Sequence, residues 1–145
     1  VQLAKAWGNV GSWLKANVPS GSTIACVPVG AIPYFSGLET YDLLGLTDRT
    51  IARYGKTYLP GAVGHQKYDT DYILSRRPDY IVYTDSGLTE KPRSHRTESL
   101  DTTYSYSLYD LVRDTRTKER YDFLSIEMPD GRYIELLHLK AGAEN

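Results

Sequence analysis

The stretch GAIPYFSGLETYDLLGLTDRTIAR, residues 30–53, carries the clearest fold signal in the sequence. It follows an apolar run, residues 22–29, whose composition is typical of a central strand covered on both faces of a sheet. Gly30 ends that run, and Pro33 has the backbone angle that suits the first turn of a short helix. A second strand is expected over residues 40–44. The stretch therefore predicts a strand, a crossover helix and a second strand in succession.

The segments on either side extend this alternation. Apolar residues between Leu3 and Leu14 recur at helical spacing, and Pro19 ends that helix. Further helices are expected over residues 49–54, 69–76 and 104–112, a strand over 80–84, and a hairpin of residues 121–128 and 132–140 around Pro129, Asp130 and Gly131. Residues 55–64 and the polar segment 85–103, which contains His95, are expected as loops, the second long and mobile.

Strands that alternate with helices favour a partly parallel sheet built from right-handed crossovers. The predicted fold class is therefore α/β, a single three-layer-like domain over residues 1–145 with a mixed, largely parallel sheet and a C-terminal antiparallel hairpin. A chain of 145 residues is long enough for one core of its own. It begins at Val1 without a methionine, which suggests a mature product or a piece excised from a larger protein.

Composition narrows the function classes. The 17 basic and 18 acidic residues nearly balance, which disfavours nucleic acid as a partner because phosphate-binding domains carry a positive excess on one face. Cys26 is the single cysteine, so no internal disulfide can form, and its apolar neighbours indicate a buried side chain. No apolar run approaches the roughly 20 residues needed to cross a bilayer.

Motifs for the common chemistries are missing. The glycines of residues 30–37 are too far apart for a dinucleotide-binding turn, and no GxSxG nucleophile motif occurs. His65, His95 and His138 lack the short spacing of a zinc site. The sequence therefore predicts no cofactor and no metal, and assigns no catalytic residue.

Six residues are candidates for binding a substrate or for locking loops. They are Tyr34, Asp42, Asp48, Arg53, His65 and Lys67. Sites of open α/β folds lie at the carboxyl ends of parallel strands, so we expect Tyr34, Asp42, Asp48 and His65 to converge there. They would contact an acceptor glycan or hold the loops together, and the apolar surroundings favour the second role.

The candidates have competing interpretations. Asp42 and Asp48 could serve as the paired carboxylates of a glycosidase, but Asp48 is placed to cap a helix and Asp42 to accept from loop amides. His65 and Lys67 could bind an anion before the helix of residues 69–76, or could form ordinary loop contacts.

Aromatic residues are the other unusual feature. Thirteen tyrosines suit sugar stacking and protein interfaces, although tyrosine is equally common on half-buried strands. Trp7 and Trp13 share the apolar face of the first helix, where they would fill the core or lie beside lipid.

Four short motifs in fixed order, GAIPYFSG, YDLLGLTD, GHQKYD and RRPDYIV, lie between Trp13 and Val82. This region resembles the soluble C-terminal domain of bacterial multi-pass membrane glycosyltransferases of the GT-C class, which includes protein mannosyltransferase-like and arabinofuranosyltransferase-like proteins. The rest of the chain, including the hairpin, matches that class only loosely.

The resemblance implies an extracytoplasmic, periplasmic-side domain that follows a bundle of transmembrane helices. Such enzymes take the sugar from a polyprenyl-phosphate donor, and their catalytic aspartate lies near the first membrane helices, outside these 145 residues. The implied partners are the chain's own transmembrane region and a glycan or polyprenyl-linked sugar. Two alternatives stay open: a free-standing carbohydrate- or protein-binding module that uses its tyrosines, and a small glycoside hydrolase that uses Asp42 and Asp48.

Overall fold

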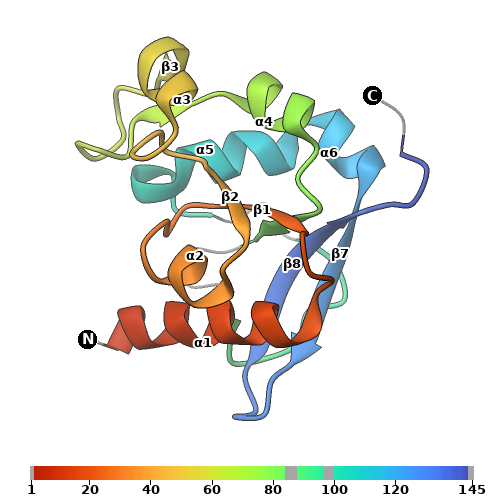
Figure 1. The fold of residues 1–145 in the computed structure, drawn as a ribbon. Helices are drawn as coiled ribbons and strands as arrows, with labels where there is room; N and C mark the ends of the chain where they lie inside the picture. The colour runs from red at the N-terminus through yellow and green to blue at the C-terminus, as the bar shows by residue number, and fades with distance from the viewer. Residues whose placement is uncertain (1, 84–87, 97–99, 144–145) are drawn as a thin grey trace.

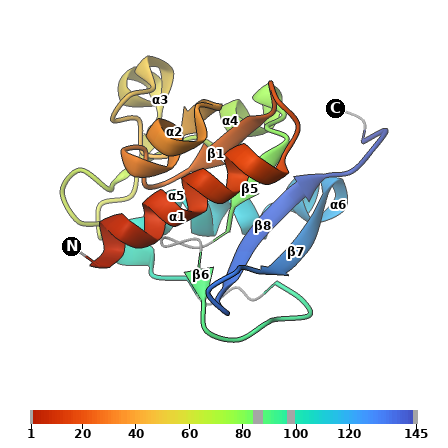
Figure 2. The ribbon, with the colours of Figure 1, turned by 60° about the horizontal axis from the view of Figure 1, so that its bottom comes forward.

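A computed structural model describes residues 2–83, 88–96 and 100–143. Helices cover both faces of one central sheet, as Figures 1 and 2 show. The helices are α1 (Gln2–Asn17), α2 (Ala31–Ser36), α3 (Arg49–Tyr54), α4 (Thr70–Arg76), α5 (Thr102–Arg113) and α6 (Thr115–Arg120). The strands are β1 (Thr23–Cys26), β2 (Glu39–Asp42), β3 (Lys56–Thr57), β4 (Lys67–Tyr68), β5 (Tyr80–Val82), β6 (Leu88–Thr89), β7 (Tyr121–Glu127) and β8 (Tyr133–Leu139).

The main sheet has six strands and mixed direction. Its order is β2-β1-β5-β8-β6, with β7 paired to β8. Strand β1 is parallel to both β2 and β5, whereas β8 is antiparallel to β5, β6 and β7. The predicted α/β class, mixed sheet and C-terminal antiparallel hairpin are therefore confirmed.

The core lies in two halves separated by the sheet. Alternate residues of β1 point to opposite faces, so Ala25 packs with α3, α4 and α5 while Ile24 and Cys26 pack with α1 and α2. Trp7 and Trp13 are partly buried against the half of the core that α1 and α2 cover. This agrees with the interpretation that both rings contribute to the core.

Close approach of α1 and α2 depends on a glycine. A Cβ atom at Gly11 would lie 2.7 Å from the carbonyl oxygen of Ile32 and 2.9 Å from Cβ of Phe35. Only a residue without a side chain fits there, so the helix that follows β1 can lie directly on α1.

Several boundaries and elements differ from the predictions. Strand β1 ends at Cys26, because Val29 donates its backbone N–H to the oxygen of Val27 in a tight turn with Pro28 at its centre. The expected loop over residues 55–64 contains β3, and the expected loop over residues 85–103 contains β6. Residues 84–87 and 97–99 of the predicted strand and loop lie outside the described residues. Helix α6 was not predicted.

Candidate functional site

A cavity of about 520 Å³ opens at the carboxyl edge of the parallel strands. The segments that come directly after β1 and β2 in the chain form two walls of the cavity. The start of α1, the β3–β4 loop and the start of α5 form the rest of its lining. These segments gather at one end of the molecule, on the left of both ribbon views. The lining residues are Leu3, Trp7, Val27, Pro28, Val29, Gly30, Leu44, Leu46, His65, Tyr104 and Ser105. We call this cavity the edge pocket.

Apolar side chains are exposed around the edge pocket. Leu46 is 63% exposed, and Leu3 and Tyr104 are each 51% exposed although all three line the cavity. The β3–β4 loop, which also supplies His65, adds two further exposed side chains. We call these five residues the apolar end: Leu3, Leu46, Leu59, Val63 and Tyr104. Exposed apolar groups gathered in this way are typical of a surface that binds a ligand, a protein or lipid.

His65 is the one sequence candidate that lines the edge pocket. Its Nδ1 lies 2.9 Å from the backbone oxygen of Tyr104, and its ring meets the Tyr104 ring edge-on. A carbonyl oxygen can only accept, so Nδ1 carries the proton and donates. In the neutral ring, Nε2 is then a hydrogen-bond acceptor.

Asp42 is fully buried at the end of β2 and holds the pocket wall in place. Its carboxylate accepts from the backbone N–H of Leu44 at 2.8 Å and of Thr47 at 2.5 Å, and from the Thr47 hydroxyl at 3.1 Å. These bonds fix the turn that presents Leu44 and Leu46 to the cavity. Asp42 therefore has the geometry of the predicted loop lock, and it is out of reach of a sugar in this conformation.

Burial also governs the neighbouring thiol. Cys26 is fully buried at the end of β1, beside Asp42. Desolvation raises the pKa of this thiol strongly, and the negative charge of Asp42 raises it further. The thiol is thus held in its protonated form, as expected for a cysteine that serves as a small apolar side chain.

Asp48 is the N-cap of α3, as predicted. Its side chain accepts from the backbone N–H groups of Thr50 at 2.8 Å and Ile51 at 3.1 Å. The hydroxyl of Tyr72, on α4, donates to its other oxygen at 3.0 Å. Asp48 therefore joins two helices, and it lies in a separate hollow of about 240 Å³ rather than in the edge pocket.

Replacing Asp48 by alanine is expected to lower the free energy of unfolding by about 1–2 kcal/mol, because the cap is lost. Urea titration followed by circular dichroism measures the change. Asp48→Asn is the matched control, since an amide oxygen can still accept from the helix and should cost about 0.5 kcal/mol or less. Unchanged stability of the alanine variant, with glycan transfer lost in the full-length protein, would instead indicate a contact with the substrate.

The remaining candidates do not converge on the edge pocket. Tyr34 is 81% exposed on α2 and contacts the ring of Phe35. Arg53 lies in the last turn of α3, with its guanidinium 5.9 Å from the ring centre of Tyr54. Lys67 donates from Nζ to the backbone oxygen of Gly55 at 3.1 Å, which is a loop contact. Of the four residues expected to converge, which are Tyr34, Asp42, Asp48 and His65, only His65 lines the edge pocket. Asp42 supports the pocket wall without lining it.

A family model described as a domain of unknown function, DUF8728, matches residues 1–130. The chain belongs to the DUF8728 family. The match includes every residue that lines the edge pocket, as well as Asp42 and Asp48, and it ends in the turn of the C-terminal hairpin. Neither the curated proteins nor the solved structures contain a match to the chain.

The DUF8728 region also contains a tyrosine cluster. The rings of Tyr58 and Tyr106 are stacked, 3.7 Å apart, and Tyr68 meets Tyr106 edge-on. Tyr109 lies beside the same ring. These contacts join the β3–β4 ladder to α5. The abundance of tyrosine in the sequence indicated an aromatic surface. The stacked rings of Tyr58 and Tyr106 are 48 residues apart in the chain, so the sequence could not show which tyrosines contact one another.

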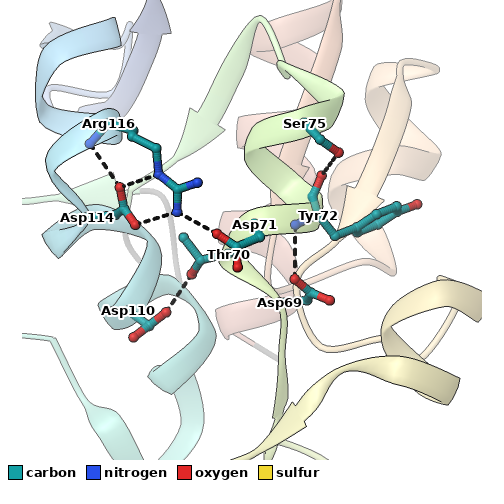
Figure 3. A network of polar contacts seen from close by, with 8 residues as sticks. All are labelled: Asp69, Thr70, Asp71, Tyr72, Ser75, Asp110, Asp114 and Arg116. Atoms are coloured by element: carbon teal, nitrogen blue, oxygen red, sulfur yellow. Dashed lines mark hydrogen bonds and ion pairs between the residues drawn. The ribbon is translucent and has the colours of Figure 1, made fainter. Parts of the chain in front are cut away.

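A polar network connects α4, α5 and α6 away from the pocket (Figure 3). Arg116 donates to both oxygens of Asp114, at 2.9 and 2.8 Å, and to Asp71 on α4 at 2.6 Å. Thr70 donates to Asp110 at 2.6 Å. The hydrogen bonds from Arg116 lower the pKa of Asp114, and those to Asp114 and Asp71 raise the pKa of Arg116. This network fixes the helices of one layer relative to one another.

The lowered pKa of Asp114 has a consequence for stability at acid pH. A carboxylate whose pKa is lower in the folded state contributes stability above its unfolded pKa, about 3.9, and loses it as the pH falls through the folded value. Wild-type stability should therefore fall more steeply than that of Arg116→Met as the pH is lowered from about 5 through the unfolded pKa and below it. Because Arg116 is 41% exposed, the difference should stay below about 1 kcal/mol.

Urea titrations at several pH values test this expectation. Arg49→Met removes the same charge from α3 and serves as the control, since Arg49 is exposed in a different helix. Parallel pH profiles for the wild type and Arg116→Met would mean that the network contributes no pH-dependent stability.

Proposed function

We propose that this DUF8728 domain is the accessory, extracytoplasmic part of a membrane glycosyltransferase, and that its apolar end faces the lipid and the transmembrane region of its parent chain. In this role it positions the acceptor or the lipid-linked sugar donor, and the transfer itself takes place in the membrane-embedded part. The observation that carries the proposal is the gathering of exposed apolar side chains at the carboxyl edge of the sheet.

The composition of that end supports a lipid-facing role. Three apolar side chains on loops are between 63% and 93% exposed: Leu46, Leu59 and Val63. Contact of their apolar surface with water is unfavourable, and a lipid or protein that covers them would remove that cost. Tyr104, which is half exposed at the same end, adds an aromatic ring of the kind that favours the boundary between lipid and water. The start of α1 lies at the same end, so a transmembrane segment preceding it would emerge there. None of the described helices is itself long and apolar enough to span a bilayer.

A carbohydrate- or protein-binding module is the second candidate. The tyrosine cluster on α5 and the β3–β4 ladder favours it, because aromatic faces bind sugars and protein partners. Stacking of Tyr58 on Tyr106 covers one face of each ring, which leaves less aromatic surface for a glycan. A hydrolase that uses Asp42 and Asp48 receives less support, since the carboxylate of Asp42 is fully buried.

The full-length protein tests the proposed role. Its coding sequence upstream of Val1 is expected to encode several apolar segments of about 20 residues each. In reconstituted membranes, the double variant Leu46→Glu, Leu59→Glu should lower transfer from a polyprenyl-linked donor by about tenfold or more, because charged groups at the apolar end would have to enter lipid.

The matched control is Tyr54→Glu, which introduces the same charge at a residue that is 72% exposed on α3, outside the apolar end. This variant should retain wild-type transfer. Upstream coding sequence without apolar segments, or equal transfer by the double variant and the wild type, would overturn the proposal.

A further inference from the structure

We infer that the edge pocket binds a single aliphatic lipid chain, with a hydroxyl-bearing head group at His65. The bilayer as the source of this lipid rests on the proposed function, whereas binding of the chain rests on the pocket itself. The ligand so defined is an uncharged lipid alcohol, which is distinct from the phosphate-linked sugar donor.

The pocket has the size and the wall of a hydrocarbon site. A volume of about 520 Å³ is in the range of small-molecule sites, and it is too small for a packed protein helix. Of the eleven lining residues, six come from the segments after β1 and β2, and five of those six are leucine, valine or proline. An aliphatic chain placed there would remove apolar surface from water on both sides of the contact, at about 25 cal/mol per Å².

A sugar ring fits this wall poorly. Each buried hydroxyl of a sugar requires a hydrogen-bond partner, and an unpaired one costs about 1–3 kcal/mol. Apart from His65, the lining offers polar side-chain groups only from Trp7, Tyr104 and Ser105. Among the described lining residues no aspartate, glutamate, lysine or arginine occurs. A charged head such as phosphate is therefore expected to stay outside the cavity.

His65 supplies a specific position for the head group. Its proton is on Nδ1, which donates to Tyr104, so Nε2 accepts in the neutral ring. Within the part of the chain that the structure describes, Nε2 has no hydrogen-bond partner. A hydroxyl at the end of an aliphatic chain is a donor of the right kind. His65 is partly exposed, which places this contact toward the mouth of the cavity.

The wall is held in place without a ligand. Asp42 fixes the turn behind Leu44 and Leu46, and the backbone N–H of Ala62 donates to Thr103 at 2.8 Å, which joins the β3–β4 loop to α5. A preformed cavity loses little conformational entropy when it is filled. Binding should therefore be measurable with short single-chain probes.

The two tryptophans provide a direct test on residues 1–145. Trp7 lines the edge pocket, whereas Trp13 lies farther along α1, in a separate hollow near the hairpin turn. The probe is undecanol with bromine at its far end, which quenches tryptophan fluorescence on contact. In Trp13→Phe, quenching of Trp7 should be saturable and reversed by plain undecanol. In Trp7→Phe, Trp13 should stay unquenched over the same range.

Matched variants locate the site. Leu46→Glu should weaken binding about tenfold or more, because it places a charge in the wall, while Leu59→Glu, on an exposed leucine outside the pocket, should change it less than about twofold. His65→Phe keeps a ring but removes Nε2, so it should weaken undecanol binding more than binding of the corresponding bromoalkane. Melting temperatures confirm that each variant is folded.

The outcomes separate this inference from the proposed function. Absence of saturable Trp7 quenching, equal quenching of both tryptophans, or equal effects of Leu46→Glu and Leu59→Glu would overturn the hydrocarbon site. An equal effect of His65→Phe on alcohol and alkane would overturn the head-group position. Saturable binding together with normal transfer by the double variant in membranes would retain the lipid site and reject the glycosyltransferase role.

Discussion

Replacing Asp42 by alanine is expected to lower the free energy of unfolding by about 3 kcal/mol. The substitution removes the acceptor of the buried N–H of Leu44, and an unsatisfied buried donor costs about 1–3 kcal/mol. It also removes the acceptor of the partly buried N–H of Thr47, which adds a smaller loss because water can reach that residue. The turn that carries Leu44 and Leu46 would also loosen. The affinity of the edge pocket for undecanol should therefore decrease together with the stability of the fold. Urea unfolding and tryptophan quenching measure the two effects.

Two further variants make this result specific. Asp42→Asn keeps one acceptor oxygen and should lose about half as much stability. Asp122→Ala removes a carboxylate that is 62% exposed and lies 3.8 Å from Lys140, so it should change stability by less than about 1 kcal/mol. If Asp42→Ala were as stable as Asp122→Ala, the role of Asp42 as the lock of the pocket wall would be wrong.

Breaking the ion pair between Arg93 and Glu135 is expected to have an effect of similar size. Glu135 lies on β8 with a fully buried side chain, and Arg93 donates to both of its oxygens from the segment that follows β6. The hydrogen bond to Glu135 raises the pKa of Arg93. Arg93→Met would leave a buried carboxylate without its cation, which costs about 3–5 kcal/mol.

The double variant provides the control for that experiment. Arg93→Met combined with Glu135→Leu replaces the buried pair by apolar groups of similar size, which is often neutral or stabilising. Its stability should therefore lie well above that of Arg93→Met alone. A double variant no more stable than the single one would show that the loss comes from the contacts of Arg93 with other groups, such as the ring of Tyr83, rather than from an unpaired carboxylate.

Features that depend on neighbours in the sequence could be predicted. Gly30, Pro33 and Gly37 mark the start and end of α2, and Gly37 takes the left-handed conformation that favours glycine at a helix end. Asp48 caps α3 because a carboxylate directly before a helix can accept from its first amides. The hairpin around Pro129, Asp130 and Gly131 was predicted for the same kind of local reason.

Features that depend on distant residues could not be predicted. Strands β3 and β6 have two residues each, too few to show a period, and they exist because β4 and β8 pair with them. The edge pocket combines the start of α1 with turns after β1 and β2 and the start of α5, so its shape follows from tertiary packing. His65 was identified as a candidate from its neighbours, but its position beside Tyr104 depends on a contact across 39 residues.

Hydrogen–deuterium exchange on lipid vesicles tests the lipid-facing surface most directly. The chain is compared in solution and bound to vesicles, and the exchange of each backbone segment is measured. Exchange is expected to slow at the start of α1, in the turn of residues 43–47, in the β3–β4 loop and at the start of α5. Unchanged exchange in these four segments, or slowing confined to the hairpin turn of residues 128–132, would contradict a lipid-facing apolar end.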